Sequence, residues 1–423
     1  MTSALEVPAA GVGVWNGTST KAAFDRWFRY PAGLSQDALA RLFDHDRNPH
    51  EGPVVDPFCG AGTVGTRAAC FDWAFVGAEA HPEIAELARL KLAPSPDVDA
   101  IVQAGEELLA SAVPVETIDA EHELVRRCFS PDVLAALTGL RDGIQAGSSA
   151  EVPYLKWALL ATLRDVANVK VGWPYLRPGL ARNPPHTDVA ARYRVRLGWM
   201  ADDLRARTSD PVAEILQGDS GDAKTWLRRE GEPKGSVALT SPPYLNNFDY
   251  ADATRLEMFF WGRNASWAEM VADVRSDMLI ATTQQATVVG ADAATSSLSE
   301  LPKAAATVER LTTALAEERG KRRAGKAYDR VLPEYALGIS RVLRQLQWQL
   351  EPGSWTGWVV GDSAPYGIYV DTPGLIQNIA LELGYTNPQS EILRSRGLRW
   401  RTNGTRHQMA LNERLIWMRT PGS

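Results

Sequence analysis

The stretch Val54-Val55-Asp56-Pro57-Phe58-Cys59-Gly60-Ala61-Gly62-Thr63-Val64-Gly65 decides the fold expected of this chain. It begins as a short apolar strand, turns at its glycines and continues as a helix to Cys70. A second strand pattern follows at Phe75–Glu79, and a second helix pattern at 81–92. Such alternation predicts an α/β fold with a doubly wound, mostly parallel sheet and helices on both faces.

The middle of the chain breaks this alternation. Helical periodicity dominates there, as in Tyr154–Leu163, before strand patterns return at 213–219 and 236–240. We therefore expect a largely helical insertion in the sheet domain. The expected parts are an N-terminal cofactor-binding half at 1–95, the insertion at 96–210 and a catalytic half at 211–423, in which 281–330 is either mobile or a helical excursion.

Composition bounds the class of protein. With 423 residues, 45% of them hydrophobic, the chain can bury a sizeable core. Its three cysteines lack metal-ligand spacing and predict neither a disulfide framework nor a metal site. No apolar run approaches the roughly 20 residues that span a bilayer, and no signal-peptide pattern is present. The expectation is a cytoplasmic protein without membrane association.

The charge distribution bears on nucleic-acid binding. A net charge of −6 argues against non-specific coating of nucleic acid, which depends on many basic contacts to phosphates. Two basic runs, at 318–326 and 394–407, are either solvated surface or the lining of a positively charged groove. The net charge therefore does not exclude binding of DNA in a cleft.

The glycine turn carries the first chemical prediction. Glycines at such a turn let a ligand approach backbone amides at a helix N-terminus. Asp56 closes the strand just before the turn, where its carboxylate would repel a pyrophosphate but accept from a cationic amino-acid head group. This favours S-adenosylmethionine over a dinucleotide. Glu79 ends the second strand, where an acidic residue can accept from both hydroxyls of a ribose in either cofactor class.

The tetrapeptide Ser241-Pro242-Pro243-Tyr244 carries the second chemical prediction. It follows an apolar strand pattern, so it should lie at the carboxyl edge of the sheet, where ligands of open α/β sheets bind. An amine could donate its hydrogens to the Ser241 hydroxyl and the Pro242 carbonyl, while Tyr244 stacks on a flat base. The alternative is that the tetrapeptide is only a turn.

Together these motifs resemble a known family. Asp-Pro-Phe-x-Gly-x-Gly-Thr at 56–63, Gly218-Asp219-Ser220 and Ser241-Pro242-Pro243-Tyr244 are similar to motifs of the DNA amino-methyltransferases, most closely the Ser-Pro-Pro-Tyr group, which usually methylates N4 of cytosine. The resemblance covers the first hundred residues and 211–419. It implies a Rossmann-like methyltransferase sheet, S-adenosylmethionine as methyl donor and DNA as substrate.

The same resemblance implies roles for individual residues. The implied catalytic residues are Ser241, Pro242, Pro243 and Tyr244. The implied cofactor-binding residues are Tyr30, Pro31, Asp56, Pro57, Phe58, Gly60, Gly62, Thr63, Glu79 and Asp219.

Several alternatives to N4-cytosine methylation stay open. Relatives with this motif also methylate N6 of adenine, and an RNA amine is a further substrate to consider. From a different class, the chain could be a non-catalytic DNA-recognition subunit with a restriction or defence partner. The insertion at 96–210 is a candidate target-recognition module, although its position in the chain is unusual for one.

Overall fold

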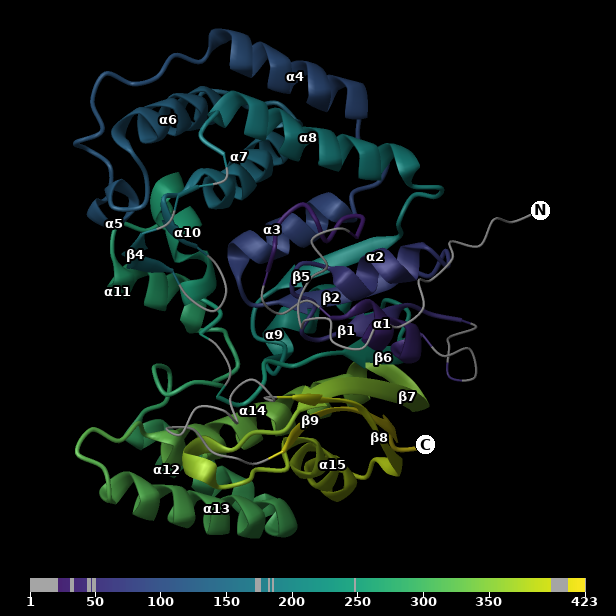
Figure 1. Cartoon of the computed structure of the whole chain (residues 1–423). Coiled ribbons are helices and arrows are strands. Elements are labelled where there is room, and N and C mark those ends of the chain that lie inside the picture. Colours follow the sequence, from purple (N-terminus) through teal and green to yellow (C-terminus); the bar gives the residue numbers. More distant parts are fainter. Residues whose placement is uncertain are drawn as a thin grey trace.

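The computed structural model describes residues 22–30, 34–43, 47, 51–171, 176–181, 183–184, 186–246, 249–396 and 410–422. A central sheet carries helices on both faces, and a helical lobe stands beyond one end of it (Figure 1). None of the helices in these ranges is long and apolar enough to cross a membrane.

The central sheet has seven strands in the order β5-β2-β1-β6-β7-β9-β8. All neighbouring pairs are parallel except those of β9, which runs antiparallel to both β7 and β8. The strand bounds are β1 (Val54–Asp56), β2 (Phe75–Glu79), β5 (Ala213–Gln217), β6 (Gly235–Thr240), β7 (Leu350–Gly361), β8 (Thr386–Arg396) and β9 (Leu411–Arg419). This is the doubly wound order with one reversed strand near its edge, a Rossmann-like methyltransferase fold. The expected fold class is confirmed.

Burial explains why the central strands form where they do. β1 is buried throughout and β2 in all but its last residue, as expected for parallel strands covered on both faces. On one face they pack against α1 (Gln36–Leu42), α2 (Thr63–Ala69) and α3 (Pro82–Lys91). The carboxyl ends of β1, β2, β5 and β6 consequently meet at one edge of the sheet.

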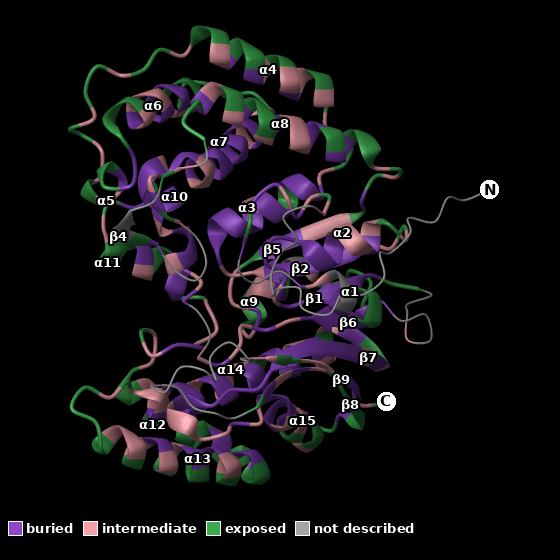
Figure 2. Cartoon of the chain, viewed as in Figure 1, coloured by how far each residue is buried: buried purple, intermediate pink, exposed green. Residues whose placement is uncertain are grey.

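The helical insertion lies between α3 and β5. Its elements are α4 (Val98–Ser111), α5 (Glu123–Arg126), α6 (Pro131–Gln145), α7 (Val152–Val166), the short pair β3 (Val169–Lys170) and β4 (Arg177–Ala181), and α8 (Val189–Ala206). Helix α7 is buried along most of its length in the centre of this lobe (Figure 2). It joins the lobe to the sheet domain through Trp157, whose Nε1 donates to Glu86 of α3 at 2.8 Å.

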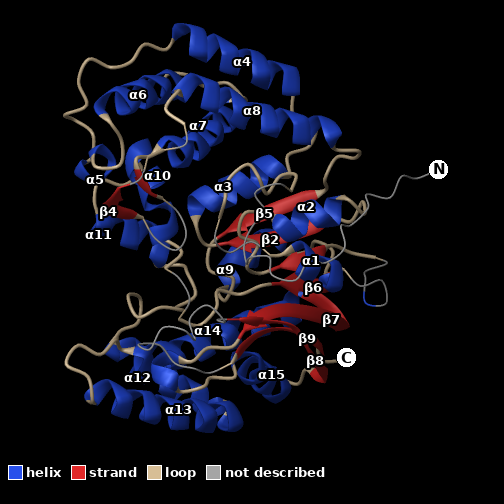
Figure 3. Ribbon diagram, in the orientation of Figure 1, coloured by secondary structure: helices blue, strands red, loops and turns tan. Residues whose placement is uncertain are grey.

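A second helical excursion connects β6 to β7 (Figure 3). Its elements are η3 (Asp252–Thr254), α10 (Arg255–Trp261), α11 (Trp267–Met270), the π-helix η4 (Val271–Arg275), α12 (Val288–Ser297), η5 (Leu298–Glu300), α13 (Pro302–Gly320) and α14 (Tyr328–Gln349). Helices α12 and α13 occupy much of 281–330 and pack on α14. The remaining helices are α9 (Ala223–Trp226) and η2 (Leu227–Arg229) before β6, and η6 (Pro365–Gly367) and α15 (Thr372–Glu382) after β7.

Candidate cofactor and catalytic site

A cavity of about 50 Å³ lies at the carboxyl edge of the sheet. Residues from both predicted motifs line it together. From the predicted cofactor set these are Tyr30, Pro57, Phe58, Gly60, Glu79 and Asp219, and from the predicted catalytic set Ser241 and Pro243. Stretches nearly two hundred residues apart in sequence therefore meet in one place.

The glycine turn has the backbone that its sequence predicts. Gly60 and Gly62 have φ values of 51° and 79°, in the left-handed region that favours glycine. Gly62 is the residue before α2, and a Cβ added there would lie 3.3 Å from the Cβ of Ala88. Glycine at this position therefore serves both the turn and the close approach of α3.

Asp56 is buried at the end of β1 and is not part of the cavity wall. Its Oδ1 accepts hydrogen bonds from the Phe58 amide at 3.0 Å and the Thr240 hydroxyl at 2.5 Å. Burial raises the pKa of Asp56 to about 7, and the nearby carboxylate of Glu79 adds to the rise. The side chain thus ties the glycine turn to the end of β6, directly before the predicted catalytic tetrapeptide.

Glu79 lines the cavity and holds the turn at the same time. Its Oε2 accepts from the Gly60 amide at 2.9 Å, and its Oε1 accepts from the His81 amide at 2.8 Å. Burial raises the pKa of Glu79 to about 7. The Ala80 amide is a third backbone donor to this carboxylate, which has about four acceptor sites, so the group can still accept from a ligand hydroxyl.

Asp219, which follows β5 in the sequence, forms another part of the cavity wall. Its Oδ1 accepts from the Gly221 amide at 2.8 Å, and burial raises its pKa. Two acidic side chains, Glu79 and Asp219, therefore face one cavity from neighbouring strands.

The Ser241 hydroxyl bonds to the backbone of the neighbouring strand. Its Oγ lies 3.0 Å from the carbonyl oxygen of Val359 on β7. A carbonyl only accepts, so the hydroxyl hydrogen points at Val359 and the oxygen can still accept. The Tyr244 side chain is a second hydrogen-bonding neighbour of this hydroxyl. Ser241 can therefore accept a hydrogen bond on the cavity wall, and its predicted contact with an amine stays a prediction.

Tyr244 is not part of the cavity wall. Its hydroxyl donates to Glu413 Oε1 at 2.8 Å, and the Arg396 guanidinium lies 4.9 Å from the ring centroid. Arg394 completes the cluster with two hydrogen bonds to Glu413, at 2.6 and 2.8 Å. Among the described residues of this loop, Tyr250 has an aromatic ring that lines the cavity.

The sequence did not point to one wall of the cavity. Asp277, Met278 and Leu279, which follow η4, complete the lining. They belong to no recognisable motif and come more than thirty residues after the tetrapeptide. A buried ion pair between Arg275 and Asp249 links this segment to the loop that carries Tyr250.

The other predicted residues lie around the cavity or outside the description. Thr63 begins α2, where its hydroxyl donates to Asp25 at 3.3 Å, and Pro242 is buried. Pro31 lies outside the described residues. So do the arginines of the second basic run beyond 396, while Arg394 of that run is paired with Glu413.

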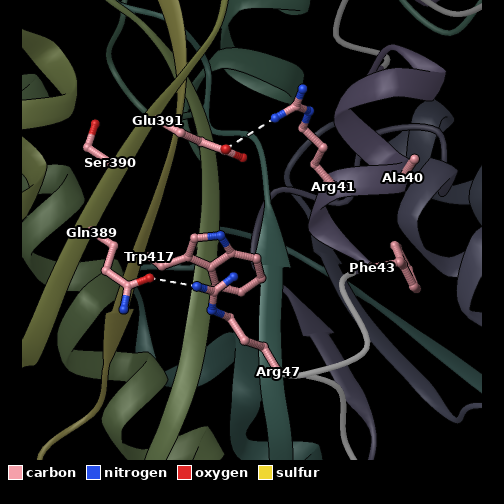
Figure 4. A pocket seen from close by; sticks show the side chains of 8 residues that line it. All are labelled: Ala40, Arg41, Phe43, Arg47, Gln389, Ser390, Glu391 and Trp417. Atoms are coloured by element: carbon pink, nitrogen blue, oxygen red, sulfur yellow. Dashed lines mark hydrogen bonds and ion pairs between the residues drawn. The ribbon is translucent and has the colours of Figure 1, made fainter.

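A larger cavity, of about 480 Å³, lies between α1 and the β8–β9 edge (Figure 4). Arg41 pairs with Glu391 at 3.1 Å across it, and Arg47 stacks on Trp417 with 4.7 Å between the guanidinium carbon and the ring centroid. None of the predicted site residues contributes to its wall.

The donor set at the smaller cavity fits S-adenosylmethionine. Carboxylates at Glu79 and Asp219 can accept from ribose hydroxyls or an adenine amine, while Phe58 and Tyr30 offer aromatic faces to an adenine or a sulfonium. The cavity is nevertheless far below the roughly 300–1,000 Å³ of typical ligand pockets.

Comparison with known proteins adds little to this geometry. No family model matches the sequence, and no curated protein matches it. The chain is similar to a solved structure of the rRNA methyltransferase AviRa from Streptomyces viridochromogenes. The match covers 92% of this chain and 86% of the AviRa chain, at 13% identity and a TM-score of 0.29. A second structure of AviRa covers 92% and 85%, at 14% identity and a TM-score of 0.28. Similarity at this level carries no information on substrate, so the fold rests on the strand order.

Proposed function

We propose that this chain is an S-adenosylmethionine-dependent methyltransferase that modifies the exocyclic amine of a nucleic-acid base, N4 of cytosine in DNA. The observation that carries the proposal is the Ser241 hydroxyl, an acceptor on the wall of the cavity that Glu79 and Asp219 also line. A donor nucleoside and an acceptor amine would then meet at one edge of the sheet.

The cofactor half of the site would hold the nucleoside through its carboxylates. Glu79 accepts from the ribose hydroxyls, Asp219 lies near the adenine, and Tyr30 covers the methionine end. S-adenosylmethionine supplies a methyl group on a sulfonium, a leaving group that needs no further activation. The chain itself contributes binding, orientation and exclusion of water.

The catalytic half would orient the target amine. Its two hydrogens are donated to Ser241 Oγ and the Pro242 carbonyl, which directs the nitrogen lone pair at the methyl carbon. The new N–C bond forms as the S–C bond breaks, and the methylated nitrogen releases one proton to solvent. The base would have to leave its helix to reach the cavity, as it does in enzymes that modify bases.

The experiment that tests the proposal supplies tritiated S-adenosylmethionine with duplex DNA or with RNA and then separates the digested nucleosides. We expect label in N4-methyl-2′-deoxycytidine from DNA. Label in N6-methyl-2′-deoxyadenosine or in an RNA nucleoside would keep the site but change its substrate. Cofactor binding without label in any nucleic acid would contradict catalysis and favour a recognition subunit.

A further inference from the structure

The segment 22–30 lies between the helical insertion and the glycine turn. Trp27 and Phe28 are fully buried, and their rings contact Tyr154 and Trp157 of α7, with centroids 6.3 and 5.0 Å apart. At the other side of the segment, Asp25 accepts a hydrogen bond from the hydroxyl of Thr63, which follows the glycine turn. The segment ends at Tyr30, which lines the cavity.

Asp203 of α8 fastens the first half of this segment. Its carboxylate accepts from the Phe24 amide at 2.8 Å and from Trp27 Nε1 at 2.9 Å. It also accepts two hydrogen bonds from Arg26, at 2.6 and 3.1 Å. The side chain of Asp203 is only 4% exposed, so these bonds are shielded from water. One insertion residue thus holds three residues of the segment, Phe24, Arg26 and Trp27.

Arg164 of α7 fastens the second half. Its guanidinium donates to the carbonyl oxygen of Arg29 at 2.5 Å and to Glu257 at 2.5 Å, and it lies 3.9 Å from the ring centroid of Phe28. A third hydrogen bond, of 2.8 Å, goes to the Ala253 carbonyl. The residue held at Arg29 directly precedes Tyr30.

We infer that the helical insertion completes the cofactor site, with Asp203 and Arg164 as positioning residues that hold Tyr30 against the cavity. The ring of Tyr30 would be 3.9 Å from a Cβ placed on Gly60, so a small shift of the segment changes the shape of the wall. The inference rests on the proposed function, because it assigns the cavity to S-adenosylmethionine. It gives the insertion a task besides any contact with a target.

The test compares two carboxylates of the insertion. Asp203→Asn keeps the shape but weakens the bonds to Arg26 and Trp27. The matched control is Glu121→Gln, because Glu121 is similarly buried, at 9% exposed, and accepts two hydrogen bonds from Arg141 at 2.7 and 2.8 Å. Arg141 bonds to Phe260 and Asp142 and makes no hydrogen bond to the segment. Calorimetric titration with S-adenosylhomocysteine and hydrogen exchange of peptides within 22–30 are the two readouts.

We expect Asp203→Asn to weaken binding at least tenfold and to speed exchange in 22–30, while Glu121→Gln changes neither, even where both lower the melting temperature equally. Arg164→Lys keeps the charge but cannot make all three hydrogen bonds of the guanidinium, and we expect it to reproduce the binding defect. Wild-type affinity and unchanged exchange in Asp203→Asn would overturn the inference alone. A wild-type protein that does not bind the cofactor would overturn the proposed function and the inference with it.

Discussion

Two buried carboxylates, Asp56 and Glu79, organise the site at the scale of single residues. Both hold backbone amides of the glycine turn, and both have a pKa raised by burial to about 7. Their charge states therefore change near neutral pH, where an ordinary carboxylate is fully ionised. Only Glu79 belongs to the cavity wall, so a bound ribose would meet its charge directly.

Cofactor affinity should consequently depend on pH. Ribose hydroxyls donate to ionised Glu79, so we expect the dissociation constant to rise roughly tenfold between pH 8 and pH 6 as the group gains a proton. Glu79→Gln should bind more weakly and show a flat profile in calorimetry. If the dissociation constant of Glu79→Gln changed with pH as much as that of the wild type, Asp56 would be the titrating group instead.

The same shift has a defined effect on stability. Because the pKa of Glu79 in the folded chain lies above its ordinary value of 4.5, its contribution to stability is fully present below pH 4.5 and is lost as the pH rises through about 7. Without cofactor, Glu79→Gln should therefore gain stability relative to wild type as the pH rises from about 4.5 to about 7, as measured by denaturant titration.

Several elements could be predicted from local sequence, because their apolar pattern is strong. The strand expected at Phe75–Glu79 is β2 with the same bounds, and the helices expected at 64–70 and 81–92 are α2 and α3 within a residue or two. The ends of β7 are harder to predict, because the strand begins at Leu350 while Pro352 and Gly353 interrupt its apolar pattern. The pattern therefore located elements better than it located their ends.

Glycines in two elements allow a matched prediction. Gly62→Ala forces a side chain into the left-handed region beside Ala88, and we expect it to cost about 1–2 kcal/mol and to weaken cofactor binding. Gly198→Ala lies within α8, where an added Cβ meets no atom within 4 Å, and should stabilise the fold by about 0.5–1 kcal/mol. Chemical denaturation of both variants checks these signs; a neutral Gly62→Ala would contradict the account of the turn.

At the scale of the whole molecule, the site depends on contacts that no local pattern reveals. Asp203 bonds to residues more than 170 positions away in the sequence. The cavity wall at Asp277–Leu279 comes from the segment between β6 and β7, which carries no recognisable motif. The environment of Tyr244 is of the same kind: its sequence suggested a ring for stacking on a base, while its partners Glu413 and Arg396 come from the end of the chain. Motifs thus predicted which strands meet at the site, and packing determined the rest of its wall.

The central claim is that Ser241 accepts from a base amine at this edge of the sheet. The most direct measurement is the single-turnover rate of methyl transfer to DNA by Ser241→Ala, compared with Ser236→Ala. Ser236 lies at the opposite end of β6, where its hydroxyl also donates to a backbone carbonyl, that of Gly52 at 3.2 Å. We predict a rate loss of roughly 100-fold or more for Ser241→Ala with cofactor affinity retained, and a wild-type rate for Ser236→Ala. A wild-type rate in Ser241→Ala would contradict the account.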